Sequence, residues 1–247
     1  MEQIQIFNTL IDNVSFKEMC EILANSLRQN HLTSIYTPNT EIVMRARENE
    51  DLSEMLNRGD YRVADGIGLI YGAKIHRTPL KERVTGVDLS YKLLEIAQKE
   101  GYGVFFLGGR PGVAKRAMEK VSEKYPGIRI VGEHHGYFKD DKQVIRQINY
   151  SKADILFVGL GFPKQESWID KNGKELETVK VAIGNGGVLD LLAGDAKRAP
   201  KIFIKLGLEW LYRLILEPSR IRRQLAIPKF LFHVIIDRNA VKIVDRD

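Results

Sequence analysis

The sequence predicts an α/β protein with a Rossmann-like, doubly wound and mainly parallel sheet of about six strands. Three observations support this fold class. Short apolar runs alternate with longer amphipathic segments along the first 195 residues, as in repeated strand and helix units. Several of the apolar runs end in Gly, Asp or Asn, residues that begin a loop or cap the next helix. With 247 residues, 44% of them apolar, the chain is long enough to bury a full core.

The expected elements follow one another in order. A small hairpin, and not a core strand, is expected at residues 4–14, and then a helix through residue 29 that Ser15 caps together with Glu18. The strands of the main sheet are expected at 34–36, 61–64, 103–107, 129–131, 155–159 and 179–183. Further helices are expected at 40–48, from 51, after 65, at 88–99, up to 124, at 140–150 and near 190.

The net charge of +6 comes entirely from the last fifth of the chain. Residues 196–247 contain 12 Lys/Arg and 5 Asp/Glu, whereas the remaining residues contain 26 and 27. The same segment is rich in aromatic residues, and its prolines, Pro218 and Pro228, break helices. We therefore divide the chain into an α/β domain, 1–195, and a basic, amphipathic C-terminal helical appendage, 196–247. Such an appendage on a neutral body suggests a polyanion or a membrane surface as its partner.

Composition also indicates the compartment. The single cysteine, Cys20, excludes an internal disulfide and a cysteine-rich metal site, which fits a reducing cytoplasm. The first ten residues lack the basic and then apolar pattern of a secretory signal. No run approaches the roughly 20 apolar residues that a membrane-spanning helix needs. We expect a cytoplasmic protein.

Asp65 is the first candidate for chemistry. It ends the expected strand 61–64 and is followed at once by Gly66 and Gly68. In open α/β sheets ligands bind beyond the carboxyl ends of the strands, and glycines let a substrate come close to the acid. The alternative is that Asp65 only caps the helix that begins near Ile67. Local sequence does not decide between the two.

Other polar residues follow strands at the same predicted edge. Thr37 and Asn39 follow the first strand of the main sheet. Gln165 lies in the exit loop of the most apolar strand, where a neutral amide suits sugar hydroxyls because it both donates and accepts. We interpret its neighbour Glu166 as a helix-start residue. Arg83 either binds a diphosphate with both arms of its guanidinium or is a solvated surface charge.

Two glycine-rich segments also follow strands. They are Gly108-Gly109-Arg110-Pro111-Gly112 and Gly184-Asn185-Gly186-Gly187, the second with Asp190 nearby as a partner for a base or ribose. Each precedes a helix whose free N–H groups could hold a phosphate, although a tight turn without a ligand is the alternative. The first segment lacks G-x-G-x-x-G spacing, and no acid is placed to hold a ribose, so a hydride-transfer enzyme is disfavoured.

The sequence offers no convincing metal site, and we expect no metal and no cofactor. His134 and His135 are adjacent, a spacing that does not easily place both rings on one ion. The only Asp-x-Asp, Asp245-Arg246-Asp247, lies away from any expected strand end of the main sheet. There is also no nucleophile elbow and no P-loop signature.

Seven motifs in order resemble the WecG/TagA glycosyltransferase family over nearly the whole chain. They are Thr37-Pro38-Asn39, Ala64-Asp65-Gly66, Glu82-Arg83-Val84-Thr85-Gly86, Leu107-Gly108-Gly109, Leu160-Gly161-Phe162-Pro163-Lys164-Gln165-Glu166, Lys197-Arg198-Ala199-Pro200 and Glu209-Trp210-Leu211-Tyr212-Arg213. The resemblance implies a metal-independent, inverting transfer of a sugar, typically N-acetylmannosamine or its uronate, from a UDP donor to polyprenyl-diphosphate-linked N-acetylglucosamine. Such products feed surface polymers, for example wall teichoic acid.

The resemblance also implies residue roles. Asp65 would be the general base, with Thr37, Asn39, Arg83 and Gln165 around the reacting sugars and diphosphates. We expect the UDP donor to meet Gly108, Gly109, Arg110, Gly136, Tyr137, Phe162, Gly186 and Asp190. Asn185 and Leu189 depart from the family pattern, where we expect a smaller and an aromatic residue.

The appendage is expected to be a lid that docks on the inner face of the cytoplasmic membrane. Its arginines, Arg213, Arg220 and Arg223, could turn back toward the sugar diphosphates. Alternatively, its apolar residues, among them Leu206, Trp210, Leu214 and Ile215, pack on the body or on another subunit, as in a homo-oligomer that forms off the membrane. A donor such as UDP-glucose or the uronate remains open. A basic nucleic-acid binder is a remote alternative that the neutral body argues against, and we expect no nucleic-acid partner.

Overall fold

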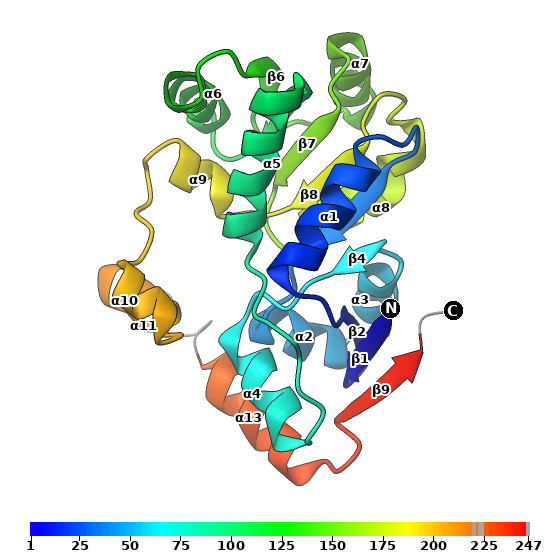
Figure 1. Ribbon diagram of the computed structural model, residues 1–247, viewed down its shortest axis with the longest axis vertical. Coiled ribbons are helices and arrows are strands. Elements are labelled where there is room, and N and C mark those ends of the chain that lie inside the picture. Colours follow the sequence, from blue (N-terminus) through cyan, green and yellow to red (C-terminus); the bar gives the residue numbers. More distant parts are fainter. Residues whose placement is uncertain (219–220, 222–224, 246–247) are drawn as a thin grey trace.

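The computed structural model of the chain describes residues 1–218, 221 and 225–245 (Figure 1). Its main sheet has six strands in the order β4-β3-β8-β7-β5-β6, and every neighbouring pair is parallel. The strands are β3 (Thr33–Tyr36), β4 (Tyr61–Arg62), β5 (Gly103–Gly108), β6 (Arg129–His134), β7 (Ile155–Gly159) and β8 (Val181–Gly184). The predicted α/β fold class is confirmed.

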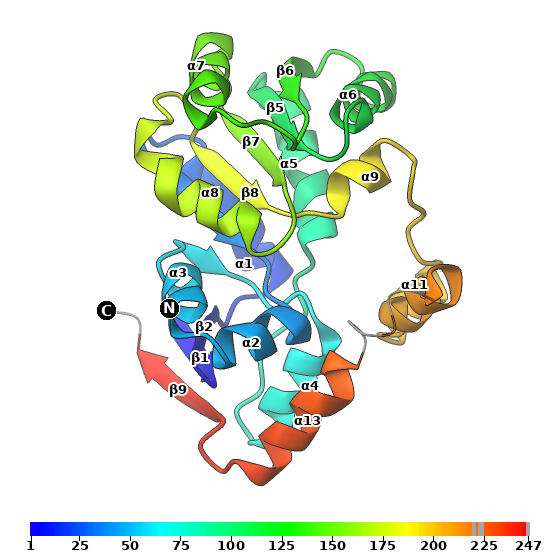
Figure 2. The same ribbon diagram turned by 180° about the vertical axis from the view of Figure 1, so that it is seen from behind.

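Helices cover both faces of this sheet (Figures 1 and 2). One face packs against α1 (Phe16–Ser26), α5 (Gly86–Glu100), α6 (Val113–Lys124) and α9 (Val188–Leu192). The other packs against α2 (Thr40–Arg47), α3 (Glu50–Asn57), α7 (Asp141–Ser151) and α8 (Lys164–Asn172), which runs into the short helix η1 (Gly173–Glu175). Successive side chains of a strand alternate between the faces, so in β5 Phe106 joins the first core and Phe105 the second.

A second, smaller sheet holds the two ends of the described chain together. Its strands are β1 (Glu2–Ile6), β2 (Thr9–Asp12) and β9 (Val241–Asp245), antiparallel in the order β2-β1-β9. We expected the N-terminal hairpin to lie outside a core, but Ile4, Ile6 and Ile11 are fully buried. The reason is the sheet's partners: α2, α4 (Ile67–Ile75) and α13 (Ala226–Ile236) close a third apolar core over the hairpin.

The C-terminal fifth has two differently placed parts. Helices α10 (Lys201–Lys205) and α11 (Glu209–Leu216) lie at the side of the molecule, whereas α13 and β9 belong to the third core (Figures 1 and 2). Phe230 of α13 is fully buried and meets the ring of Phe7 edge-on at 5.8 Å between centroids. The helix passes close over α4 because Gly72 has no side chain: a Cβ there would lie 2.7 Å from the Phe230 ring.

A buried ion pair joins the two sheets. The Arg62 guanidinium of β4 lies 3.2 Å from the Asp12 carboxylate of β2, and both side chains are almost entirely buried. The same carboxylate accepts a bond of 2.7 Å from the Arg62 backbone N–H. Both charges are withdrawn from water, so either one would destabilise the folded protein if its partner were removed.

In the described part of the chain, no helix has both the length and the apolar content to cross a bilayer.

Candidate functional site

The carboxyl ends of the six parallel strands form one edge, and most of the predicted site residues lie along it. Asp65 follows β4, and its backbone N–H donates to the Pro38 carbonyl after β3 at 3.1 Å. The two loops meet closely at Gly66, where a Cβ would lie 3.1 Å from both Asn39 Cα and Asn39 Cβ. The segments around Asp65 and Thr37 are therefore held together, as the sequence predicted.

Asp65 does not cap the helix that follows it. The N-cap position of α4 is Gly66, so the capping alternative is wrong. The carboxyl group is about a quarter exposed and faces Arg83. Burial raises the pKa of Asp65 above its ordinary value, while the guanidinium groups of Arg83 and Arg213 act in the opposite direction. A carboxylate with a raised pKa is a stronger base than an ordinary aspartate.

Arg83 is not a solvated surface charge, since its side chain is mostly buried and paired. Its Nε donates to the Asp65 carbonyl at 2.5 Å, and its Nη2 lies 3.7 Å from Asp65 Oδ1. Nη2 also donates to Glu209 of α11 at 3.0 Å. Arg213, one turn further along α11, donates to the other oxygen of Glu209 at 2.9 Å. Asp65, Arg83, Glu209 and Arg213 thus form a chain of charges from the strand edge to the appendage.

The structure gives the two polar residues after β3 different surroundings. Thr37 is buried, and its hydroxyl donates to the Gly184 carbonyl at the end of β8, at 3.3 Å. Asn39 is half-buried and caps α2, since its Oδ1 accepts from the Ile42 N–H at 3.1 Å. Both residues therefore stabilise the edge itself as well as lying on it.

Gln165 is buried at the start of α8, between the exit loops of β7 and β8. Its Oε1 accepts from the Gly161 N–H at 3.1 Å, and its Nε2 donates to Glu166 Oε1 at 2.9 Å. Gly186 comes so close that a Cβ there would lie 3.0 Å from Gln165 Oε1. Gln165 thus holds the exit loops of β7 and β8 together at the start of α8.

Glu166 lies in the first turn of α8, as expected of a helix-start residue, and it is only 1% exposed. Its Oε2 has no hydrogen-bond partner among the described residues. Burial raises the pKa of Glu166 to about 7, against the opposing bond from Gln165. Local sequence contains no signal for this burial, because it involves residues of distant strands: a Cβ on Gly184 of β8 would lie 3.5 Å from Glu166 Oε1, and the Tyr36 hydroxyl of β3 donates to the Glu166 carbonyl at 3.2 Å.

Glycines form the other half of the edge. A Cβ on Gly108 would collide with the Gly159 carbonyl of the neighbouring strand. The Gly109 N–H donates to that same carbonyl at 3.0 Å, and Gly136 donates to Gly109 at 2.8 Å. Gly186 approaches Gly161 in the same way, since its Cβ would lie 3.2 Å from Gly161 Cα. The exits of β5, β6, β7 and β8 are consequently packed closely against one another, in a way that side chains at these positions would prevent.

The remaining predicted donor residues border these glycines. Arg110 is exposed in the loop before α6, and Tyr137 is 68% exposed after Gly136. The Phe162 ring is covered by the Arg45 guanidinium, 4.7 Å from its centroid. Asp190 lies in α9, where its carbonyl accepts from the backbone N–H groups of residues 195 and 196.

Of the three predicted appendage arginines, the structure describes one. Arg213 is joined to the strand edge through Glu209. Arg220 and Arg223 lie outside the described residues. Glu209 itself was missed by sequence reasoning, although it belongs to one of the seven motifs.

No group of three or more His, Cys, Asp or Glu that could hold a metal ion occurs in the described ranges. His134 and His135 lie in and after β6, where His134 Nδ1 is 2.8 Å from the His135 carbonyl oxygen.

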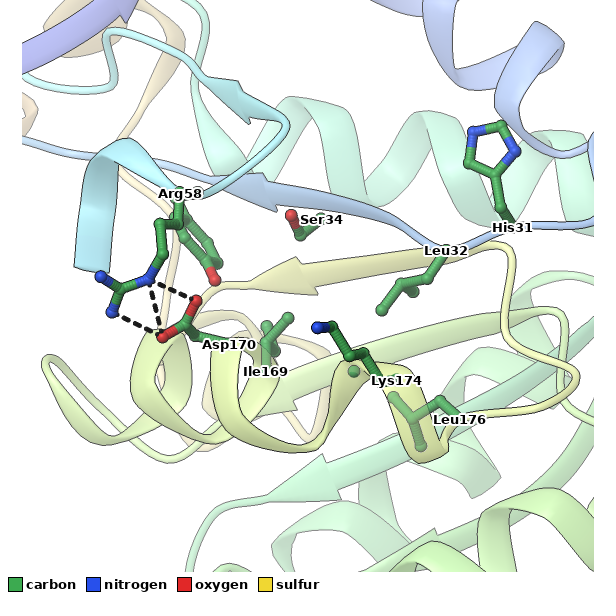
Figure 3. A pocket seen from close by; sticks show the side chains of 10 residues that line it. His31, Leu32, Ser34, Arg58, Ile169, Asp170, Lys174 and Leu176 are labelled. Atoms are coloured by element: carbon green, nitrogen blue, oxygen red, sulfur yellow. Dashed lines mark hydrogen bonds and ion pairs between the residues drawn. The ribbon is translucent and has the colours of Figure 1, made fainter. Parts of the chain in front are cut away.

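A separate cavity of about 380 Å³ lies between β3 and the C-terminal end of α8 (Figure 3). Arg58 and Asp170, joined at 2.8 Å, form one side of it, and Lys174 and His31 lie toward the other. None of the predicted site residues lines this cavity.

Comparison with known proteins shows the family to which the chain belongs. The model of the "Glycosyl transferase WecG/TagA/CpsF family" matches residues 4–242. A Bacillus spizizenii protein named N-acetylglucosaminyldiphosphoundecaprenol N-acetyl-beta-D-mannosaminyltransferase is 40% identical over 85% of this chain and 81% of its own length. Staphylococcus aureus proteins of the same name, from strains MRSA252 and NCTC 8325, are 35% and 34% identical over 97% of this chain and 95% of theirs. The chain therefore belongs to the WecG/TagA/CpsF family of glycosyltransferases.

Proposed function

We propose that this chain transfers N-acetylmannosamine from UDP-N-acetylmannosamine to N-acetylglucosamine linked to undecaprenyl diphosphate, a step of wall teichoic acid linkage-unit synthesis. The relatives' shared name supplies the acceptor and the sugar. The observation that carries the proposal is the Asp65 carboxyl group at the strand edge, with raised basicity and a guanidinium beside it.

The reaction follows from these groups. Asp65 accepts the proton of the acceptor hydroxyl as its oxygen attacks the anomeric carbon of the donor sugar. The bond between that carbon and the UDP oxygen breaks, and the diphosphate leaves with the bonding pair. Arg83 and Arg213 supply positive charge for it, through a planar fork of donors that suits phosphate oxygens. Attack from the face opposite UDP inverts the anomeric centre and gives the β linkage of the relatives' name from an α-linked donor.

The glycine half of the edge is the proposed donor site. Gly108, Gly109, Gly136 and Gly186 let the exit loops of these strands pack closely together, which shapes the surface that we propose holds the diphosphate. Arg110, Tyr137, Phe162 and Asp190 border the same region and are the proposed contacts for the phosphates, base and ribose. Thr37, Asn39 and Gln165, between the two halves, would orient the reacting sugars.

We also propose that α10 and α11 dock on the inner face of the cytoplasmic membrane, where the lipid-linked acceptor lies. Four of their large apolar side chains are more than half exposed: Ile202, Leu206, Ile215 and Leu216. Lys201 and Lys205 lie beside them in α10, and basic residues near an anionic leaflet contribute about 1 kcal/mol each. The same apolar face could close against a second copy of the chain off the membrane.

Transfer is tested with a panel of UDP-linked sugars and a lipid-linked N-acetylglucosamine acceptor. We expect the N-acetylmannosamine donor to be used best, whereas preference for UDP-glucose or the uronate would replace the proposed donor. Asp65→Asn should keep the fold and UDP binding but lower turnover at least about a hundredfold, the scale of a lost general base. Near-normal turnover by a folded Asp65→Asn protein would refute the assignment.

Docking is tested by sedimentation with vesicles that contain phosphatidylglycerol. We expect the double variant Ile202→Glu/Ile215→Glu to lose vesicle binding, whereas Ile243→Glu, at an exposed position of β9, keeps it. Unchanged binding of the double variant would contradict docking through this face. Sedimentation velocity of both variants without vesicles reports whether the face joins two copies.

A further inference from the structure

Glu209 is a buried carboxylate that the reaction described above does not use. It is the first residue of α11, and it is 5% exposed. Each of its oxygens accepts from a different guanidinium: Oε2 from Arg83 at 3.0 Å and Oε1 from Arg213 at 2.9 Å. A buried carboxylate between two arginines is costly to desolvate and is favourable only with both partners in place. Its position therefore fixes both guanidinium groups.

The consequences for Asp65 follow from the same contacts. Arg83 is held from two directions, by the Asp65 carbonyl through Nε and by Glu209 through Nη2. Without Glu209, two guanidinium groups would lie near Asp65 with less negative charge to balance them. Positive charge stabilises the carboxylate form and so weakens the base.

We propose that Glu209 is a positioning residue for the transfer, which fixes Arg83 beside the catalytic carboxylate, balances its charge, and joins the appendage helix to the site. The inference rests on the proposed function, because the base and the diphosphate are those of that reaction. In this role Glu209 needs no contact with the acceptor hydroxyl or the donor. It acts through Arg83 and Arg213.

The charged groups around Asp65 support this role. Among the described residues, they are Arg83 from the loop before α5 and Glu209 and Arg213 from α11, and the Gly86 N–H adds a hydrogen bond. Burial raises the pKa of Asp65 most. Arg83 lowers it, Glu209 raises it, and Arg213 and Gly86 lower it. Glu209 is thus the charged group that keeps Asp65 basic against two arginines.

The test compares Glu209→Gln, which keeps the shape and removes the charge, with Glu209→Asp, which keeps the charge and shortens the reach. The matched control is Glu48→Gln, which breaks the exposed 2.6 Å ion pair between α2 and Lys229 of α13, away from Asp65. Circular dichroism and urea unfolding establish that each variant is folded. The acidic limb of kcat against pH and the KM values for both substrates are then measured.

For Glu209→Gln we expect the acidic limb to move to lower pH by roughly one unit, the scale on which a nearby charge moves a carboxyl pKa. We expect kcat on the plateau to fall roughly three- to tenfold because the base is weaker. Glu209→Asp should keep the limb near its wild-type pH with a lower kcat. Glu48→Gln should match wild type in the pH of the acidic limb and in kcat on the plateau. A rise in KM alone, or an unmoved limb in folded Glu209→Gln, would overturn the proposal.

A second readout does not depend on transfer. The Asp65 carboxyl group can be titrated by carbon-13 NMR in selectively labelled wild-type and Glu209→Gln protein, with Asp65→Asn to assign the signal. A lower pKa of Asp65 in Glu209→Gln supports the inference, and an equal pKa refutes it. If wild-type protein transfers no sugar, the proposed function fails while this titration still decides the electrostatic role of Glu209.

Discussion

The buried carboxyl group of Glu166 should make the stability of this protein fall as the pH rises. Burial raises the pKa of Glu166 from 4.5 to about 7. Between these two values the unfolded chain has released the proton and the folded chain has kept it. The folded state therefore binds more protons than the unfolded state, and the free energy of unfolding decreases with pH. The stability that the protonated Glu166 carboxyl group contributes is retained below pH 4.5 and is lost as the pH rises toward 7.

The size of this effect follows from the two pKa values. A rise in the pKa of Glu166 from 4.5 to about 7 corresponds to roughly 3 kcal/mol in the free energy of unfolding, at about 1.4 kcal/mol for each pH unit. Most of it, about 2 to 3 kcal/mol, falls between pH 5 and pH 8. Glu166→Gln removes the titration but keeps an oxygen that can accept from Gln165. Any cost of a buried amide applies equally at both pH values, so the difference between them isolates the ionisation.

The measurement is urea unfolding of wild type and Glu166→Gln at pH 5 and pH 8, at constant ionic strength. Glu123→Gln, at an exposed position of α6, is the control for loss of one negative charge. We expect wild type and the control to lose about 2 to 3 kcal/mol more than Glu166→Gln between the two pH values. If the free energy of unfolding changes equally in all three proteins between pH 5 and pH 8, Glu166 ionises normally in the folded state and the reasoning is wrong.

Two further predictions concern the ion pair between the sheets and the charge on the leaving group. Asp12→Ala should lower the free energy of unfolding by about 3 to 5 kcal/mol, because it leaves the buried Arg62 guanidinium without its carboxylate. The measurement is urea unfolding. A loss below about 1 kcal/mol would show that the pair behaves like a solvated ion pair. Transfer should survive EDTA, since Arg83 and Arg213 can carry the charge role at the departing diphosphate; a large loss that magnesium or manganese restores would contradict this.

The sequence predicted the parts of the structure that depend on local pattern. The six parallel strands could be predicted because each apolar run is short and followed by a helix signal. Asp65 and Thr37 could be placed together because the carboxyl ends of parallel strands share an edge. Gly66 and Gly108 lie where loops or strands come too close for a side chain. The glycines in the sequence therefore correctly indicated the position of this edge of the sheet.

Features that depend on distant partners could not be predicted. Glu209 looked like one residue of an amphipathic helix, yet its partner Arg83 lies 126 positions earlier. The burial of Glu166 depends on strands remote in sequence. The N-terminal hairpin seemed peripheral because its covering helix, α13, and its third strand, β9, come from the other end of the described chain. Propensity and period describe neighbours along the chain and carry no information on such contacts.

The pairing of β1 with β9 has a consequence for how the chain is made. Ile6 leaves the ribosome long before its partner Val241, and at about 5 to 20 residues per second the delay is roughly 10 to 50 seconds. During that interval the hairpin has an open strand edge and the apolar side chains of Ile4 and Ile6 lack their full cover, a state prone to association with other chains. The main sheet can form earlier, because its last strand ends at Gly184. Any variant that ends near residue 195 would remain in this unfinished state permanently.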